Sequence, residues 1–154
     1  MTDNANMRNA RERQNDEHYT KCSDAADEIL RFAPYLKGKR ILCPFSDYRF
    51  SQVVLFLVQF FHILGLEHLT ATCIDLGASA WRFDYDGKTQ TVTRLKQGGS
   101  FDSPEVTEIM YHSDVVIDNP PFSKFEIIFL WLENAPARLN SRTIQSFNNY
   151  GKLN

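Results

Sequence analysis

Residues that form metal centres or disulfide frameworks are scarce in this sequence. Its three cysteines, Cys22, Cys43 and Cys73, lie far apart and include no Cys-x-x-Cys pair. Its four histidines show no spacing typical of metal ligands. Structural zinc sites and disulfide frameworks need closely spaced ligands or evenly paired cysteines. We therefore predict neither a metal site nor a disulfide framework.

An excess of charge of one sign is also lacking, because 17 Lys and Arg face 19 Asp and Glu and give a net charge of -2. This balance does not indicate a polyanion partner for the whole surface, so a surface for nucleic acid has to be local. Residues 1–16 are polar and lack the apolar segment of a secretory signal. We expect a flexible tail there and a cytoplasmic protein.

Long apolar runs are missing as well. The most apolar stretch, "SQVVLFLVQFFHILGL", holds about 13 residues between Gln52 and Leu64, whereas a helix that spans a bilayer needs about 20. Gln52, Gln59 and His62 fall on one stripe of the helix that this pattern predicts. We expect a buried crossover helix that ends at Gly65, and no contact with a membrane.

The residues that are present fit a single α/β domain. The chain has 154 residues, of which 43% are hydrophobic and 23% charged, as in an ordinary globular protein. We place the folded domain at residues 17–135. Residues 136–154 show neither an apolar strand pattern nor a helical period, so we expect an irregular tail.

Hydrophobic patterns predict a strand, helix, strand unit in the first half of this domain. Apolar residues recur at helical spacing over 26–33, with Ser23 as the N-cap and Pro34 as the end of a helix. A short apolar strand then ends at Pro44, and a second strand closes on Asp75 after the crossover helix. Two strands that are joined in this way run parallel.

The second half predicts a hairpin, two helices and one more strand. Residues 81–95 alternate around Asp86-Gly87, a dipeptide suited to a type I′ turn. Ser103 is a suitable N-cap for a short helix that leads into the strand "DVVID". A well-buried helix is expected over "FEIIFLWLENA". Together these elements indicate a mostly parallel sheet with a hairpin insertion.

Four strand or loop ends carry the polar and aromatic residues that are candidates for a site. They are "CPFSD" after the first strand, Asp75 after the second, "GGSFDS" before a helix and "DNPPF" after the last strand. Ligands of open α/β sheets bind outside the carboxyl ends of the strands, so we expect these segments to surround one cleft. Asp75 either accepts hydrogen bonds from ribose hydroxyls or caps the turn before Gly77.

The segment from Asn119 to Phe122 gives the sharpest chemical indication. An amide oxygen and a backbone carbonyl beside a proline can together accept both hydrogens of a planar exocyclic amine, and the aromatic ring can stack on the same heterocycle. The alternative is a proline turn that only ends the strand. We prefer the functional interpretation because the segment follows an apolar strand in a chain with a βαβ unit.

The stretch "DNPPFS" resembles the catalytic motif of amino-group methyltransferases that use S-adenosylmethionine. "NDEHYTKCSDAADEIL", "GKRILCPFSDYRFSQVV", "LGLEHLTATC", "FDYDG" and "GGSFDS" follow the layout of the EcoRI-type adenine-specific DNA methyltransferases. The resemblance covers roughly residues 15–125. It implies a partial Rossmann-like methyltransferase fold, because family members continue with later strands and a target-recognition region. We therefore expect a truncated relative.

Site residues follow from the resemblance, position by position. The motif that would hold a flipped adenine comprises Asn119, Pro120, Pro121 and Phe122. The positions that would bind the cofactor are Tyr19, Thr20, Cys43, Pro44, Asp47, Asp75, Phe101 and Asp102. The loop after the first strand departs from the family pattern, because it has no Gly-x-Gly and carries Ser46 where relatives tend to have a second acid.

The resemblance implies methyl transfer from S-adenosylmethionine to the exocyclic amine of adenine in double-stranded DNA. Two alternatives stay open at this point. The chain could be a non-catalytic remnant, or a subunit that needs a second chain to supply the missing strands. Its acceptor could also be RNA or a protein glutamine, although the EcoRI-like segments favour DNA.

Overall fold

A computed structural model describes residues 22–74, 80–120 and 122–134. They form one sheet with the strand order β4-β3-β2-β1-β5. Its strands are β1 (Arg40–Cys43), β2 (His68–Thr72), β3 (Trp81–Tyr85), β4 (Gln90–Arg94) and β5 (Val115–Val116). The tails predicted at 1–16 and 136–154 lie outside the described residues.

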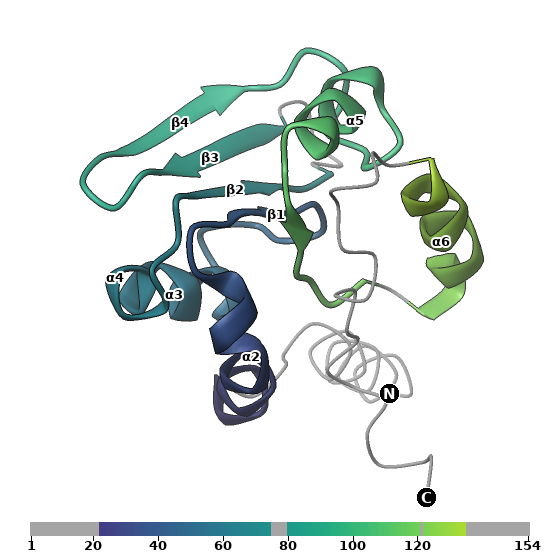
Figure 1. Ribbon diagram of the computed structural model, residues 1–154. Helices are drawn as coiled ribbons and strands as arrows, with labels where there is room; N and C mark the ends of the chain where they lie inside the picture. Colours follow the sequence, from purple (N-terminus) through teal and green to yellow (C-terminus); the bar gives the residue numbers. More distant parts are fainter. Residues whose placement is uncertain (1–21, 75–79, 121, 135–154) are drawn as a thin grey trace, which may run out of the picture.

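The sheet is mixed, so the prediction of a mostly parallel sheet was wrong, although the predicted hairpin is present. β1 pairs in parallel with β2, as the βαβ pattern predicted, and it also pairs in parallel with β5. β3 and β4 form the predicted hairpin, but β3 also pairs antiparallel along β2. The hairpin therefore extends the sheet (Figure 1). The buried ring of Phe83 favours this arrangement, because it belongs to the same hydrophobic cluster as Leu69 and Ala71 of β2.

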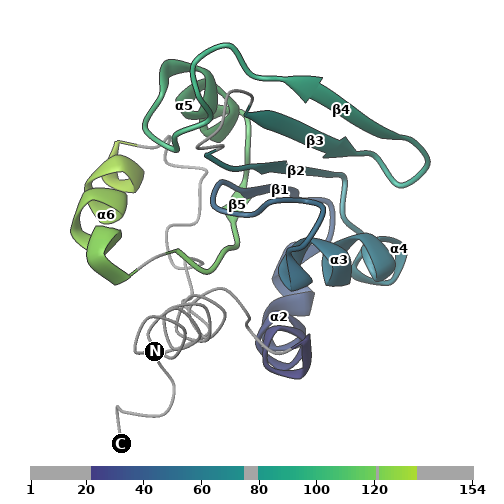
Figure 2. The same ribbon diagram turned by 180° about the vertical axis from the view of Figure 1, so that it is seen from behind.

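Helices cover both faces of this sheet (Figures 1 and 2). The helices are α2 (Cys22–Leu36), α3 (Gln52–Gln59), α4 (Phe61–Leu64), α5 (Pro104–Tyr111) and α6 (Phe125–Glu133), with a short 3-10 helix at Phe122–Lys124. Side chains of β1 alternate between the two faces, so Ile41 packs with α2, α3 and α4 whereas Leu42 packs with α5 and α6. Both faces are thus buried at β1, as in α/β proteins with a central parallel pair, whereas every residue of β4 is exposed.

The first two predicted helices differ from the structure in their details. Pro34 lies inside α2 and does not end it, and Ser23 lies within the helix and so is not its N-cap. The helix continues to Leu36 because that side chain is buried in the core. The crossover helix ends at Gly65 with φ 68°, as predicted, but it is interrupted at Phe60 between α3 and α4.

The turn predicted for the hairpin was also wrong. The Asp86-Gly87 turn is not type I′, because Tyr85 pairs with Gln90 and leaves a four-residue loop. The Asp86 carboxylate accepts hydrogen bonds from the backbone N–H groups of Lys88 and Thr89 at 2.9 and 2.7 Å, which favours this longer turn.

The prediction of a well-buried helix over "FEIIFLWLENA" was wrong in part, because α6 is buried on one side only. Ile128, Trp131 and Leu132 face the core, whereas Ile127, Phe129 and Leu130 are 51 to 60% exposed. By contrast, α5 begins as predicted, with Pro104 in its first turn and the Ser103 hydroxyl accepting from Val106 N. Among the described residues, no helix is both long enough and apolar enough to cross a bilayer.

The loop between β4 and α5 approaches the end of β2 closely. Both Gly98 and Gly99 have positive φ angles, of 79° and 69°. A Cβ at Gly99 would lie 2.4 Å from the backbone oxygen of Cys73 and 2.4 Å from Ala80 Cβ, whereas one at Gly98 would meet nothing within 4 Å. The absence of a side chain at residue 99 therefore lets this loop close onto the carboxyl end of β2.

Replacing these two glycines separates backbone strain from crowding. Gly98→Ala and Gly99→Ala both place an L-residue in the left-handed region, at a cost of about 1 kcal/mol. Gly99→Ala also forces a Cβ into Cys73 and Ala80, so we expect its free energy of unfolding to fall by about 1 to 3 kcal/mol more. Urea unfolding followed by circular dichroism measures the difference. Equal losses in the two variants would contradict the close approach.

Candidate functional site

The carboxyl ends of β1, β2 and β5 lie side by side and form one edge of the sheet, as the strand-end pattern of the sequence predicted. The loop after β1, the end of β2 and the segment after β5 are joined there by hydrogen bonds. Ser46 N donates to the Thr72 carbonyl at 3.1 Å, and Phe45 N donates to Asp118 Oδ2. The loop that contains Gly99 closes over the same edge. We take this edge as the candidate functional site.

Asp118 lies at this edge, two residues after the end of β5. Its side chain is 1% exposed. Besides the bond from Phe45 N, its Oδ1 accepts hydrogen bonds from the Ser46 hydroxyl at 2.7 Å and from Asn119 N at 2.8 Å. Sequence reasoning did not place Asp118 among the site residues. An acidic residue immediately after an apolar strand was the signal that could have identified it.

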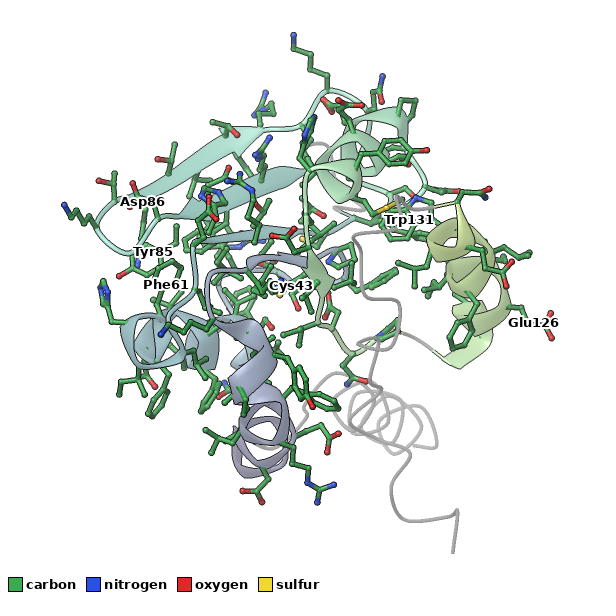
Figure 3. The ribbon with its side chains drawn as sticks, in the orientation of Figure 1. Cys43, Phe61, Tyr85, Asp86, Glu126 and Trp131 are labelled. Atoms are coloured by element: carbon green, nitrogen blue, oxygen red, sulfur yellow. The ribbon has the colours of Figure 1, made fainter. Side chains whose placement is uncertain are left out.

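Burial raises the pKa of Asp118 to about 6, although the hydrogen bonds from Ser46, Phe45 and Asn119 oppose this shift. Cys43, at the end of β1, is fully buried (Figure 3). Burial also raises the pKa of its thiol, and the negative charge of Asp118 raises it further. Cys43 is thus a neutral core residue, and its side chain is closed to a ligand.

A chain of hydroxyl groups extends from Asp118 to the start of α3. The Ser51 hydroxyl donates to Ser46 Oγ at 3.0 Å, and the Ser46 hydroxyl donates in turn to Asp118. Ser51 is the N-cap of α3, and its Oγ accepts a hydrogen bond from Val54 N. The network therefore fixes the loop after β1 between the strand end at Asp118 and the helix that follows it.

Aromatic rings line the same edge. Phe45 and Phe101 lie with ring centroids 5.1 Å apart, and Phe101 meets Trp131 of α6 edge-on at 5.3 Å. Figure 3 shows the position of Trp131 on α6. Phe101 is only 3% exposed, whereas Phe45 is half-buried. The predicted cofactor residue Phe101 is therefore at the expected edge, but its ring packs in the core and supports the more accessible ring of Phe45.

Two of the three predicted acidic residues, Asp47 and Asp102, lie at the surface of this edge. Arg49 binds the Asp47 carboxylate through two nitrogens, with Nε to Oδ1 at 3.0 Å and Nη2 to Oδ2 at 2.7 Å. This hydrogen bonding lowers the pKa of Asp47, which is half-buried. Asp102 is exposed, and its carboxylate accepts a hydrogen bond from the Ser100 hydroxyl. The Asp47 carboxylate therefore keeps its negative charge near neutral pH.

The predicted catalytic segment is described only in part. Asn119 is half-buried, and its side-chain oxygen is shielded from solvent. Pro120 is buried, and Pro44 in the loop after β1 is buried as well. Phe122 opens the 3-10 helix that precedes α6, but its side chain lies outside the described part. Tyr19, Thr20, Asp75 and Pro121 also lie outside the described residues.

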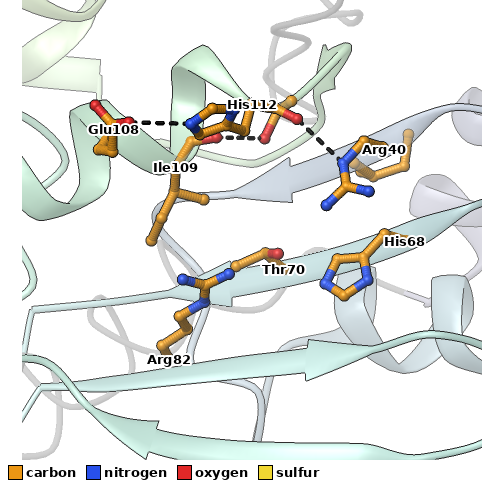
Figure 4. Close-up of a pocket in the computed structure, with 9 residues that line it drawn as sticks. Arg40, His68, Thr70, Arg82, Glu108, Ile109 and His112 are labelled. Carbon is orange, nitrogen blue, oxygen red and sulfur yellow. Dashed lines mark hydrogen bonds and ion pairs between the residues drawn. The ribbon is translucent and has the colours of Figure 1, made fainter.

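A small pocket lies at the opposite edge of the sheet, where β1 and β2 begin (Figure 4). Its volume of about 100 Å³ is well below the ~300 Å³ or more of a typical small-molecule site. Its charged groups already have partners within the protein: Arg40 contacts Glu67, His112 contacts Glu108, and Arg82 contacts Asp84. We therefore assign this pocket no part in the candidate functional site.

No metal centre is found within the described ranges. They contain no group of three or more His, Cys, Asp or Glu side chains that could hold a metal ion. The chemistry of the candidate site is instead that of carboxylates, hydroxyl groups, an amide and aromatic rings.

The raised pKa of Asp118 predicts that its contribution to stability falls as the pH rises. Between about pH 4 and pH 6 the folded state holds a proton on Asp118 that the unfolded state has already lost. The free energy of unfolding therefore decreases across this window, by up to about 3 kcal/mol from this group. We expect Asp118→Asn to remove that part of the slope. Urea unfolding from pH 4.5 to 7.5 measures it.

Asp84→Asn serves as the control for this experiment. Burial raises the pKa of Asp84, but hydrogen bonds from His68 and Arg82 outweigh it, so the net pKa is lowered. Asp84 therefore titrates below the window in which Asp118 acts, and its replacement should leave the slope between pH 4.5 and 6 in place. An Asp118→Asn variant with the slope of the unsubstituted protein would rule out the shift.

Comparison with known proteins identifies the family of this chain. The family described as "Adenine-specific methyltransferase EcoRI" matches residues 6–90 and 82–132. Type II methyltransferase M.MpnI of Mycoplasma pneumoniae is 36% identical over 117 residues, which cover 76% of this chain and 37% of that protein. Type II methyltransferase M.MgeORF184P of Mycoplasma genitalium is 31% identical over the same share of each chain.

A third relative is more distant. Type II methyltransferase M.EcoRI of Escherichia coli is 26% identical over 137 residues, with 77% of this chain and 42% of that protein covered. The chain thus spans about two-fifths of the length of these relatives. No solved structure matches it significantly. The extent of the family match nevertheless establishes that the chain belongs to the EcoRI-type adenine-specific methyltransferases.

Proposed function

We propose that this chain is the part of an adenine-specific DNA methyltransferase that binds the cofactor and carries the catalytic motif. The supporting observation is that Asn119, the first residue of that motif, follows directly on Asp118, whose carboxylate is bonded to the loop after β1. The residue proposed to hold the target amine is therefore fixed beside the loop proposed to bind the cofactor. The fold would be the first part of a Rossmann-like methyltransferase domain.

Membership of a methyltransferase family implies a methyl donor of the S-adenosylmethionine type. When bound, this cofactor supplies an electrophilic methyl group on a sulfonium. The groups at the strand edge have chemistry that suits it. Carboxylates at Asp47 and Asp102 can accept hydrogen bonds from its ammonium and hydroxyl groups, and the half-buried ring of Phe45 can contact its adenine. Asp47 would share its carboxylate with Arg49.

Other positions in the proposed cofactor site rest on the family pattern. Tyr19 and Thr20 would hold the methionine part, and Asp75 would accept hydrogen bonds from the ribose hydroxyls. Three of the predicted cofactor residues are buried, namely Cys43, Pro44 and Phe101. They would contribute by supporting the backbone of the loop after β1 and the ring of Phe45.

The chemistry proposed for the catalytic motif depends on two acceptors. The Asn119 side-chain oxygen and the Pro120 carbonyl would accept the two hydrogens of the adenine amine and draw electron density toward its nitrogen. The side-chain oxygen of Asn119 is shielded from solvent. A hydrogen bond to the amine is stronger in such surroundings than in water. Phe122 would stack on the flipped base, and Pro121 would fix the chain direction between them.

Double-stranded DNA is the proposed substrate, and the cytoplasm is the proposed location. RNA and protein glutamine remain alternative acceptors for an Asn-Pro-Pro-aromatic motif. Incorporation of tritiated methyl groups from S-adenosylmethionine into duplex DNA, RNA and protein, measured in parallel, distinguishes them. Incorporation confined to adenine in duplex DNA is the expected result.

Asn119→Ala tests the catalytic role of the amide. It removes one acceptor from the bound amine, which costs about 1 to 3 kcal/mol, so we expect methyl transfer to slow roughly 5- to 150-fold. Cofactor affinity, measured by titration calorimetry, should stay unchanged. Asn119→Asp is the matched control, because it keeps one oxygen acceptor at the same place. A near-normal rate in Asn119→Ala would refute the assignment.

A second candidate function is that of a remnant or subunit that binds cofactor or DNA and needs a further polypeptide for catalysis. Two features of the described residues favour it. β5 stands at the end of the sheet order, and α6 exposes Ile127, Phe129 and Leu130 beside it. An apolar helix face next to an edge strand suits a polypeptide that adds strands to the sheet.

Charge placed on α6 tests this candidate. The double variant Ile127→Lys and Leu130→Lys should weaken binding of the portion of M.MpnI outside the matched region at least about tenfold, because it buries charge in the interface. Ile63→Lys is the control, since Ile63 is 79% exposed on α4, away from that edge. Sedimentation velocity measures the association. If both variants associate like the unsubstituted chain, α6 is not the interface.

A further inference from the structure

Asp118 connects parts of the chain that are far apart in sequence. Its carboxylate extends from the end of β5 to Phe45 and Ser46, which lie 73 and 72 residues earlier. The same carboxylate accepts a hydrogen bond from the backbone N–H of Asn119. One buried group therefore fixes both the loop after β1 and the first residue of the proposed catalytic motif.

The bonds of this carboxylate are divided between its two oxygens. Oδ2 is used by Phe45 N, whereas Oδ1 is shared by the Ser46 hydroxyl and Asn119 N. Movement of the loop after β1 would therefore change the position of the carboxylate and with it the direction of the Asn119 backbone. The Ser46 hydroxyl is in turn held by Ser51 at the start of α3, so the loop is anchored on both sides.

Stability alone does not account for an ionisable group at this position. The groups bonded to the carboxylate are two peptide N–H groups and one hydroxyl, and the titratable side chain that interacts with it is the buried thiol of Cys43. No cation among the described residues is bonded to it. A buried charge without a countercharge reduces stability, and an apolar residue of similar size would commonly be better tolerated. The carboxylate at this position therefore indicates that its hydrogen bonds are needed to fix the geometry of the site.

We propose that Asp118 is a positioning residue, whose carboxylate couples the loop after β1 to Asn119 so that cofactor binding at the loop orients the amide for the target amine. This inference rests on the proposed function and deepens it. The carboxylate itself does not contact the reacting atoms. It acts through the backbone of Asn119 on one side and of Phe45 on the other.

Backbone amide exchange, followed by NMR on the full chain, tests the coupling. Asp118→Asn keeps the shape of the side chain but turns one acceptor into a donor. We expect the amides of Phe45 and Asn119 to exchange about tenfold faster or more, and together, while the amides of the β3–β4 hairpin stay unchanged. Asp84→Asn removes a carboxylate elsewhere in the sheet and should leave Phe45 and Asn119 unaffected. Unchanged exchange at both residues in Asp118→Asn overturns the inference.

A second arm adds S-adenosylmethionine. In the unsubstituted chain we expect it to slow exchange at both Phe45 and Asn119, whereas in Asp118→Asn it should slow exchange at Phe45 alone. A slowed Asn119 in that variant contradicts the coupling. If the unsubstituted chain does not respond to S-adenosylmethionine, the proposed function fails, while the first arm still decides whether Asp118 links the two segments.

A milder variant covers the case in which Asp118→Asn does not fold. Ser46→Ala removes the hydroxyl that shares Oδ1 with Asn119 and leaves the carboxylate in place. It should accelerate exchange at Phe45 and Asn119 in parallel, by a few-fold. Acceleration at one of the two residues without the other contradicts the proposed link.

Discussion

Parallel pairing of β1 with β2 on one side and β5 on the other fixes the arrangement of the whole candidate site. The loops that follow the three strands must leave the sheet at the same edge. Residues that are more than 70 positions apart, such as Phe45 and Asp118, thereby come within hydrogen-bonding distance. Helix packing on both faces then supports this edge, since Leu42 and Val116 hold α5 and α6 while Ile41 and Val115 hold α2, α3 and α4.

Much of this architecture could be predicted from local patterns. The βαβ unit, the hairpin and the Ser103 cap all carry strong periodic or capping signals, and the structure contains each of them. The predictions that were wrong depend on contacts beyond the local pattern. Pro34 stays within α2 because Leu36 is buried further along, and β3 joins the main sheet because Phe83 packs under β2.

The position of the candidate site could be predicted from the sequence more readily than the hydrogen bonds that join its segments. Strand-end reasoning placed the loop after β1 and the Asn119 segment at one edge, where both are found. It could not identify Asp118 as the connecting group, because that role depends on two backbone donors that carry no side-chain signal. It also assigned Phe101 a contact with the cofactor, which stays a prediction, but it could not show that this ring packs edge-on against Trp131 of a helix further along the chain.

The shortness of β5 affects the order in which the domain assembles. β5 has two ladder positions against β1, whereas β2 has four against β1 and four against β3. Paired residues of β1 and β2 are 28 positions apart, as in Arg40 and His68, whereas those of β1 and β5 are 74 apart, as in Ile41 and Val115. Because loops that are shorter close more readily, we expect the βαβ unit and the hairpin to form first. The segment that carries the proposed catalytic motif would then be the last to dock.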